Sequence, residues 1–299
     1  MLKNLCYIFT LLFITTSVCQ TNTNVKQNKI AKLIISLNAF HNAKSQDAQA
    51  VAEILAQHIK EEYKLDYCFE VTTPGTNSEI EKVAGNDFDY IILTTEEYFD
   101  LQKKLPFEPY TTNYSAGKIG FVYHLIVNKA DNIKDISQLK NETLYVLARE
   151  TQKIPFLWLD KLLSEKGLPN QRKFFKEIIV DYKATNVLLP VFFKKAKACI
   201  ITEVSLNLLA ELNPAIKNNI SILNSSDNIL LGLGCLNKKK FGSEIYNILK
   251  DIIPKLSSNL SGQQLLKLFN ADKLVPYKEE YLQNYLNFYF LMQFLNPLG

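Results

Sequence analysis

The stretch Ile119-Gly-Phe-Val-Tyr-His-Leu-Ile-Val-Asn-Lys129 decides the fold that we expect for this chain. It is apolar and rich in β-branched and aromatic residues, which is typical of strands. We interpret it as one long strand that leaves a first α/β lobe and enters a second. A cleft would then lie beside it, with Tyr123 and His124 at the hinge or on the cleft floor.

Strands and helices alternate on both sides of this stretch. Before it, a buried strand over Lys32–Leu37 precedes an amphipathic helix over 47–62, whose apolar residues recur at helical spacing. After it, Pro155 opens a helix over Phe156–Lys166 that Gly167 ends. Alternation of this kind predicts mainly parallel sheets covered by helices.

Two later elements bear on the same interpretation. Because proline is tolerated only in the first turn of a helix, the helix that contains Pro190 is expected to begin close to Leu189. Asn228–Leu236 is expected to form a strand that returns to the first lobe. It would cross beside 119–129, and the two strands together would form a hinge.

Length and composition fit a protein with a large core. A chain of 299 residues, of which 47% are hydrophobic and 21% charged, is long enough for two lobes. The net charge of +4 is small and no dense Lys/Arg tract occurs, so no nucleic-acid partner is expected. With only 10 glycines, extended Gly-rich phosphate loops are not expected either.

The first residues resemble a signal peptide. Lys3 supplies the positive charge, Leu5–Ile14 forms an apolar run, and Ser17 and Cys19 are the small residues before a cleavage site. The run is shorter than the ~20 residues that cross a bilayer. We therefore expect export, with residues 1–19 removed and 20–29 as a polar tether. Lipid attachment at Cys19 is the alternative.

No catalytic or metal-binding pattern is present in the sequence. HExxH, GxSxG and P-loop motifs are missing, and three histidines do not cluster with other ligands. Cys68, Cys199 and Cys235 are odd in number and lie in apolar contexts, so buried thiols are expected rather than disulfides. We expect no enzyme, no cofactor and no metal.

The end of the predicted strand Phe88–Leu93 indicates where a ligand would bind. Thr94 and Glu97 form a capping box at the start of a helix. In open α/β sheets, ligands bind at the carboxyl ends of strands, against helix N-termini whose free N–H groups favour anions.

From about Lys29 to Tyr289, the chain resembles the phosphate, phosphite and phosphonate substrate-binding proteins of ABC transporters, the PhnD-like branch of the type 2 periplasmic binding proteins. The resemblance is carried by pieces that occur in the order and spacing of that family. These pieces are Asp87–Tyr98, Leu125–Lys140, Val187–Phe193 with Ala198–Ile201, Glu211–Pro214, and Leu260–Lys267 with Val275–Tyr277.

The resemblance implies a bilobal type 2 periplasmic-binding-protein fold, with two α/β sandwich lobes joined by two hinge strands. Lobe 1 would comprise 30–122 and 225–299, and lobe 2 would comprise 123–224. Ligand contacts in the family come from loops at strand ends. Carried over by position, together with the two hinge residues, they are Phe40, His41, Thr94, Thr95, Tyr123, His124, Thr151, Gln152, Thr185, Asn186 and Glu203.

The implied function is capture of a small anionic ligand, such as phosphate or a phosphonate, by a monomer that serves an ABC permease in the inner membrane. An extracytoplasmic sensor domain for a membrane signalling partner, or an exported enzyme on the same scaffold, stays open. The chain departs from the family at Arg149–Lys153, where members carry a Ser/Thr- and Gly-rich phosphonate motif. The ligand identity is therefore not implied.

Overall fold

A computed structural model describes residues 29–40, 45–85, 87–149, 152–269 and 271–295 of the chain. The predicted signal peptide, and the tether except for residue 29, lie outside the described residues. No helix within the described ranges is both long enough and apolar enough to span a membrane.

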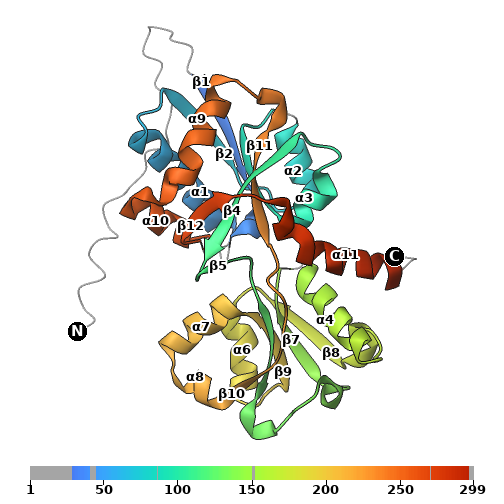
Figure 1. Cartoon of the computed structure of the whole chain (residues 1–299). Helices are drawn as coiled ribbons and strands as arrows, with labels where there is room; N and C mark the ends of the chain where they lie inside the picture. The colour runs from blue at the N-terminus through green and yellow to red at the C-terminus, as the bar shows by residue number, and fades with distance from the viewer. Residues whose placement is uncertain (1–28, 41–44, 86, 150–151, 270, 296–299) are drawn as a thin grey trace, which may run out of the picture.

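The described strands fall into two sheets, each with its own helices (Figure 1). The strand order of the first sheet is β12-β4-β11-β3-β1-β2, with β5 paired to β4. Its strands are β1 (Lys29–Ile35), β2 (Tyr67–Thr72), β3 (Tyr90–Thr94), β4 (Phe107–Ser115), β5 (Lys118–Ile119), β11 (Gly232–Asn237) and β12 (Lys273–Pro276).

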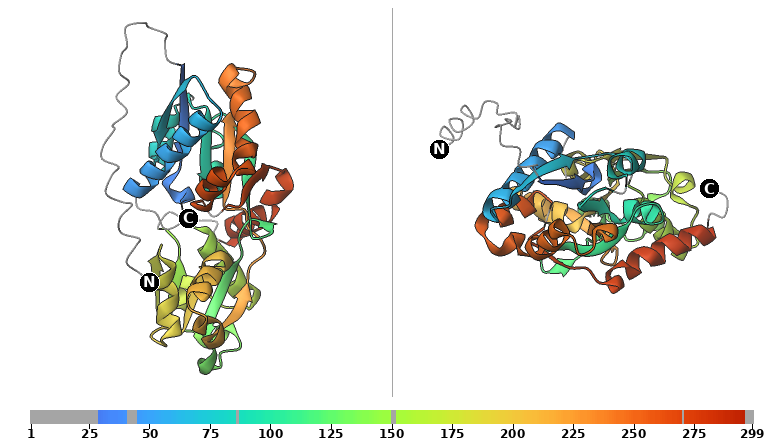
Figure 2. Two further views of the ribbon diagram at one scale, coloured as in Figure 1. Left: turned by 90° about the vertical axis from the view of Figure 1, so that its left-hand side faces the viewer. Right: turned by 90° about the horizontal axis from the view of Figure 1, so that it is seen from above.

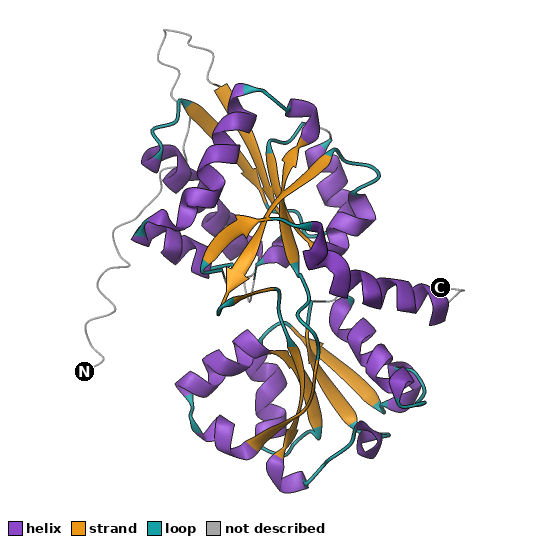
Figure 3. Cartoon of the chain, in the orientation of Figure 1, coloured by secondary structure: helices purple, strands orange, loops and turns teal. Residues whose placement is uncertain are grey.

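Helices cover both faces of this first sheet (Figure 3). One face packs against α1 (Ser45–Glu62), α9 (Glu244–Ile252), η5 (Ile253–Ser258) and α10 (Leu260–Lys267). The other face packs against α2 (Asn77–Ala84), α3 (Thr95–Leu101) and η6 (Glu279–Leu282). Short 3-10 turns are η1 (Leu37–Ala39) and η4 (Lys238–Lys240).

The second sheet has the order β10-β6-β9-β7-β8. Its strands are β6 (Tyr123–Asn128), β7 (Thr143–Leu147), β8 (Glu177–Asp181), β9 (Ala198–Thr202) and β10 (Ile220–Ser225). One face packs against α4 (Ile154–Glu165) and α5 (Gln171–Phe174), and the other against α6 (Ala184–Phe192), α7 (Glu203–Leu212) and α8 (Ala215–Asn219). The remaining turns are η2 (Lys129–Asp131) and η3 (Ile136–Leu139).

These two bodies are the two predicted α/β lobes, stacked end to end (Figure 2). The lobe limits that we derived from the sequence stay a prediction. The C-terminal helix α11 (Gln283–Leu295) leaves the first lobe and lies beside α4 of the second (Figure 1).

The long strand expected over 119–129 is wrong in one respect, because it is broken. β5 ends at Ile119 and β6 begins at Tyr123. Between them, Gly120 has a φ of 82°, and a Cβ there would lie 2.7 Å from the carbonyl oxygen of Ile229. Phe121 and Ile229 form an isolated antiparallel bridge, so the two connections cross with their backbones in contact. The return strand is likewise shorter than predicted and begins at Gly232.

The helix expected near Leu189 is also corrected. α6 begins at Ala184 and holds Pro190 in its interior. Proline at this position removes one bond to the carbonyl of residue 186, which lies in an exposed first turn where water can replace it. By contrast, α1 and α4 are confirmed within a few residues of the predicted limits, and the Thr94–Glu97 capping box is present.

Candidate functional site

The carboxyl ends of the parallel strands in both lobes meet at the junction between the lobes. In the first lobe, β1, β2 and β3 run parallel, and in the second, β7, β8 and β9 do. Thr202 at the end of β9 pairs with Tyr123, the first residue of β6 after the crossing. The N-termini of α4, α6 and α7 follow the ends of β7, β8 and β9 at this junction. Such an edge presents backbone N–H groups to the cleft.

One of these helix N-termini is held by a side chain from the opposite lobe. The Oε1 atom of Glu96, in the first turn of α3, accepts hydrogen bonds from the N–H groups of Lys153 (2.6 Å) and Ile154 (2.7 Å) at the start of α4. Glu96 is 8% exposed. Burial raises the pKa of its carboxyl to about 7, although the two backbone hydrogen bonds act in the opposite direction.

A second polar contact joins the lobes on the other side of the crossing. Lys118 on β5 forms an ion pair with Glu203, the first residue of α7. The N–H of Glu203 donates to the carbonyl of Val122 in the crossing segment, at 2.8 Å. Both side chains are partly exposed, so the ion pair contributes little to the stability of the fold. Together with the backbone hydrogen bond, it holds the start of α7 beside the hinge.

A small pocket opens on the second-lobe side of this junction, with a volume of about 40 Å³. The guanidinium of Arg149 lies 5.3 Å from the ring centre of Tyr182 within it. Desolvation lowers the pKa of Arg149, but an arginine stays charged at neutral pH. The lining residues are Phe40, Tyr123, Leu147, Ala148, Arg149, Gln152, Tyr182, Thr202 and Leu231.

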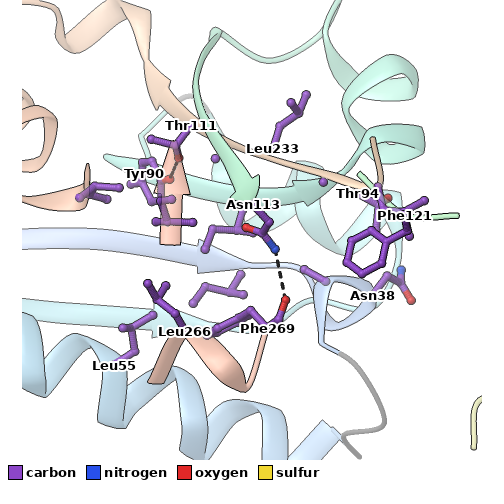
Figure 4. Close-up of a pocket in the computed structure, with 18 of the residues that line it drawn as sticks. Asn38, Leu55, Tyr90, Thr94, Thr111, Asn113, Phe121, Leu233, Leu266 and Phe269 are labelled. Atoms are coloured by element: carbon purple, nitrogen blue, oxygen red, sulfur yellow. Dashed lines mark hydrogen bonds between the residues drawn. The ribbon is translucent and has the colours of Figure 1, made fainter. Parts of the chain in front are cut away.

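A larger cavity, of about 90 Å³, extends from the same junction into the first lobe (Figure 4). Asn38, Thr94 and Phe121 lie at one end of the group drawn in Figure 4, and Leu55 and Tyr90 lie at the other. Glu96, Tyr123, Gln152 and Ile154 also line it, so it reaches the start of α4. Both pockets therefore border the junction between the lobes, and Tyr123 and Gln152 line both of them.

Four of the predicted ligand contacts line these pockets. Tyr123 and Gln152 line both, Thr94 lines the larger, and Phe40 lines the smaller. Phe40 also packs on Phe269, with ring centres 4.8 Å apart, and Thr94 caps α3. Gln152 accepts from the N–H of Arg149 at 3.0 Å.

The other described candidates do not line either pocket. Thr95 donates to the carbonyl of Leu230 (2.6 Å) and so braces the second crossing segment. His124 lies 2.9 Å from the hydroxyl of Ser225, and desolvation lowers its pKa. Thr185 and Asn186 are exposed in the first turn of α6, and Glu203 is engaged with Lys118.

His41 and Thr151 lie outside the described residues, and the whole set of ligand contacts stays a prediction. Glu96, Lys118 and Arg149 are the residues that sequence reasoning did not select. The sequence contains one local indication for Glu96. Glu97 forms the capping box with Thr94, so the neighbouring carboxylate of Glu96 is not needed to cap the helix. Among the described residues, no group of three potential metal ligands occurs.

The family model described as "ABC transporter, phosphonate, periplasmic substrate-binding protein" matches residues 39–282. No curated protein sequence matches the chain.

Three solved structures illustrate what the chain is similar to. A binding protein component of an ABC phosphonate transporter from Pseudomonas aeruginosa is 15% identical, with 89% of this chain and 87% of that chain covered and a TM-score of 0.64. PhnD1 from Prochlorococcus marinus, in complex with methylphosphonate, is 15% identical (89% and 99% covered, TM-score 0.65). A Xanthomonas citri protein bound to ATP is 13% identical (90% and 98% covered, TM-score 0.66). At these identities the likeness shows the fold, and it confirms the predicted bilobal arrangement.

Proposed function

The chain belongs to the phosphonate-binding family of periplasmic substrate-binding proteins of ABC transporters, and from this membership we propose that it captures a small anionic ligand between its lobes for an ABC importer. The observation that carries the proposal is the family match over residues 39–282, which spans strands of both sheets and both crossing segments. This family consists of substrate-binding proteins rather than enzymes.

The chemistry of the cleft supports an anion. At the N-terminus of α4, the N–H groups of Lys153 and Ile154 already bind one carboxylate, that of Glu96, and Arg149 lines the adjoining pocket. Helix N-termini and guanidinium groups both favour oxyanions. Two of the similar structures hold ligands with phosphorus oxyanions, methylphosphonate and ATP, which fits a ligand of this class.

The proposal includes the cellular setting. Export through the N-terminal segment would place the protein outside the inner membrane, as a soluble monomer or held by a lipid on Cys19. The permease would receive the ligand when the lobes open. Ligand contacts are proposed for Phe40, Thr94, Tyr123, Gln152 and Arg149, the last of which joins the set because of its place in the pocket.

Ligand-induced stabilisation tests this function. The purified protein is heated with phosphate, phosphite, methylphosphonate or a sulfonate, and a true ligand at 100-fold excess over its dissociation constant stabilises it by about 2.7 kcal/mol. Arg149→Ala is expected to weaken binding at least tenfold, because the pocket loses its cation. Arg172→Ala on α5 is the matched control, since that arginine is exposed and lines neither pocket.

Two results would count against the proposal. Absence of any thermal shift across the whole panel removes the anion-binding function. Consumption of a compound during incubation favours an exported enzyme on this scaffold.

A further inference from the structure

The cavity in the first lobe is walled mainly by apolar side chains. The sheet contributes Leu33 and Ile35 of β1. The helix α1 contributes Leu55, and the C-terminal part of the chain contributes Leu266 and Phe269 (Figure 4). All five are buried. The cavity therefore lies between the sheet and the α1 and α10 layer, inside the core of the lobe.

The polar groups along its walls already have partners. The hydroxyls of Tyr90 and Thr111 are 2.6 Å apart, and the amide of Asn113 donates to the carbonyl of Phe269 at 3.2 Å. Water needs two to four polar partners to occupy a buried site, and cavities lined by Leu, Ile and Phe take apolar molecules instead. The walls thus favour a hydrocarbon group over a hydrated one.

A glycine on the sheet makes room for the Tyr90–Thr111 pair that forms part of the wall. Gly234 lies on β11, and a Cβ there would lie 1.7 Å from the hydroxyl oxygen of Tyr90 and 2.6 Å from that of Thr111. The glycine lets both side chains lie against the strand, where they pair with each other. A larger residue would force them from their present places.

The mouth of the cavity coincides with the proposed anion site. Thr94, Glu96 and Gln152 line the cavity at the end that meets α4, and Gln152 also lines the pocket that holds Arg149. One ligand can therefore place an anionic head between the lobes and a second group inside the first lobe.

We propose that the first-lobe cavity binds a short, unbranched aliphatic group, so that the ligand is an organic anion with an apolar chain rather than inorganic phosphate or phosphite. The inference rests on the proposed function, because it assigns the other end of the same ligand. A cavity of ~150 Å³ accommodates benzene. The present volume of about 90 Å³ accommodates a chain of about four carbons.

A chain-length series tests the assignment. Inorganic phosphate and methyl-, propyl-, pentyl- and octylphosphonate are titrated calorimetrically into the purified protein. Each methylene that enters the cavity is expected to raise the affinity about fourfold. The rise should level off near the pentyl compound, when the cavity is filled. Equal affinities for methyl- and pentylphosphonate would overturn the inference.

Variants that fill the cavity locate the effect. Ala39→Leu adds bulk to a small residue of the lining, and Leu266→Phe adds bulk to its wall. Both are expected to abolish the gain for pentylphosphonate and to preserve methylphosphonate binding. Leu105→Phe is the matched control, because Leu105 is buried in the core on the opposite face of the sheet and does not line the cavity.

The outcomes separate this inference from the function on which it rests. If none of the five anions binds to the unaltered protein, the proposed function fails. If methylphosphonate binds and chain length has no influence, only the cavity assignment fails. Loss of the chain-length gain in the control variant as well as in the filled variants would also contradict the assignment, because the gain would then not come from this cavity.

Discussion

At the residue scale, two opposing forces act on the carboxyl group of Glu96. Burial disfavours its ionised form, while the N–H groups of Lys153 and Ile154 favour it. Lys153, Glu97, Tyr123 and Tyr285 are the other titratable groups that interact with it. Because burial prevails, the pKa rises from 4.5 to about 7. Near neutral pH the cleft can therefore exist with this position either charged or neutral.

This shift predicts how stability depends on pH. Since the folded-state pKa is raised, folding favours the protonated form, and the stabilisation present below pH 4.5 is lost as the pH rises to about 7. The loss is on the order of 3 kcal/mol, given 1.36 kcal/mol for each pKa unit. Glu96→Gln keeps an acceptor for the two N–H groups and cannot ionise, so its unfolding free energy should lack this decline.

Urea unfolding at several pH values across that window provides the measurement. Glu211→Gln, an exposed glutamate of α7, is the control and should follow the unaltered protein. If Glu96→Gln also followed it, the carboxyl group would not titrate between these states, and its proposed burial at the α4 N-terminus would be wrong.

The sequence could predict only part of this site. Thr94 and Gln152 could be predicted from the sequence, because the carboxyl ends of parallel strands meet at one edge of a sheet. Glu96 carries only a weak local signal, a carboxylate that the capping box does not use. Its role could not be predicted, because its hydrogen-bond partners lie 57 and 58 residues further along the chain, in the other lobe. Glu203 was selected as a ligand contact, but its ion pair with Lys118, 85 residues away in the sequence, was not predicted. Contacts of this kind follow from the packing of the lobes, which no local pattern encodes.

At the element scale, predictions succeeded where the signal was local. Apolar spacing and the Pro155–Gly167 pair were enough for α1 and α4. The strand over 119–129 failed at Gly120, because its break depends on contact with Ile229, more than a hundred residues away. The predicted start of α6 was wrong, because proline is generally excluded from helix interiors. Here the helix tolerates Pro190, since the hydrogen bond that it removes lies in the exposed first turn.

The two glycines of the β5 region allow a direct test of the crossing. Gly120 and Gly117 both have positive φ, 82° and 84°, but only Gly120 would bring a Cβ against the Ile229 backbone. Gly117→Ala is expected to cost about 1 kcal/mol for the left-handed backbone alone. Gly120→Ala should cost roughly 1–3 kcal/mol more, because the crossing segments must separate.

Urea unfolding of the two variants measures this difference, and ligand titration shows whether the hinge is affected. Equal destabilisation by both substitutions would mean that the crossing backbones are not in close contact. In that case the hinge would be looser than the Phe121–Ile229 bridge indicates.

At the scale of the whole molecule, the C-terminal helix α11 joins the two lobes in addition to the two crossing segments. α11 brings Tyr285 against Phe99 of α3, with ring centres 4.9 Å apart and planes at 9°. Tyr285 and Phe288 also belong to the core of the second lobe, around Trp158 and Leu162 of α4. The C-terminal helix therefore packs on both lobes at once, and any opening of the cleft must slide or break this contact.

This arrangement predicts that Tyr285 couples the lobes. Tyr285→Ala removes a side chain that is 3% exposed, which should cost about 3–5 kcal/mol, as for other large aromatic truncations. Because the lost contacts lie between the lobes, unfolding should separate into two transitions, and the folded protein should show a larger radius of gyration in small-angle scattering.

Tyr246→Ala is the control, since Tyr246 is 2% exposed but packs only within the first lobe. It should destabilise the protein without enlarging the folded form. A single transition and an unchanged radius for Tyr285→Ala would show that the hinge and the Glu96 contact hold the lobes together without α11.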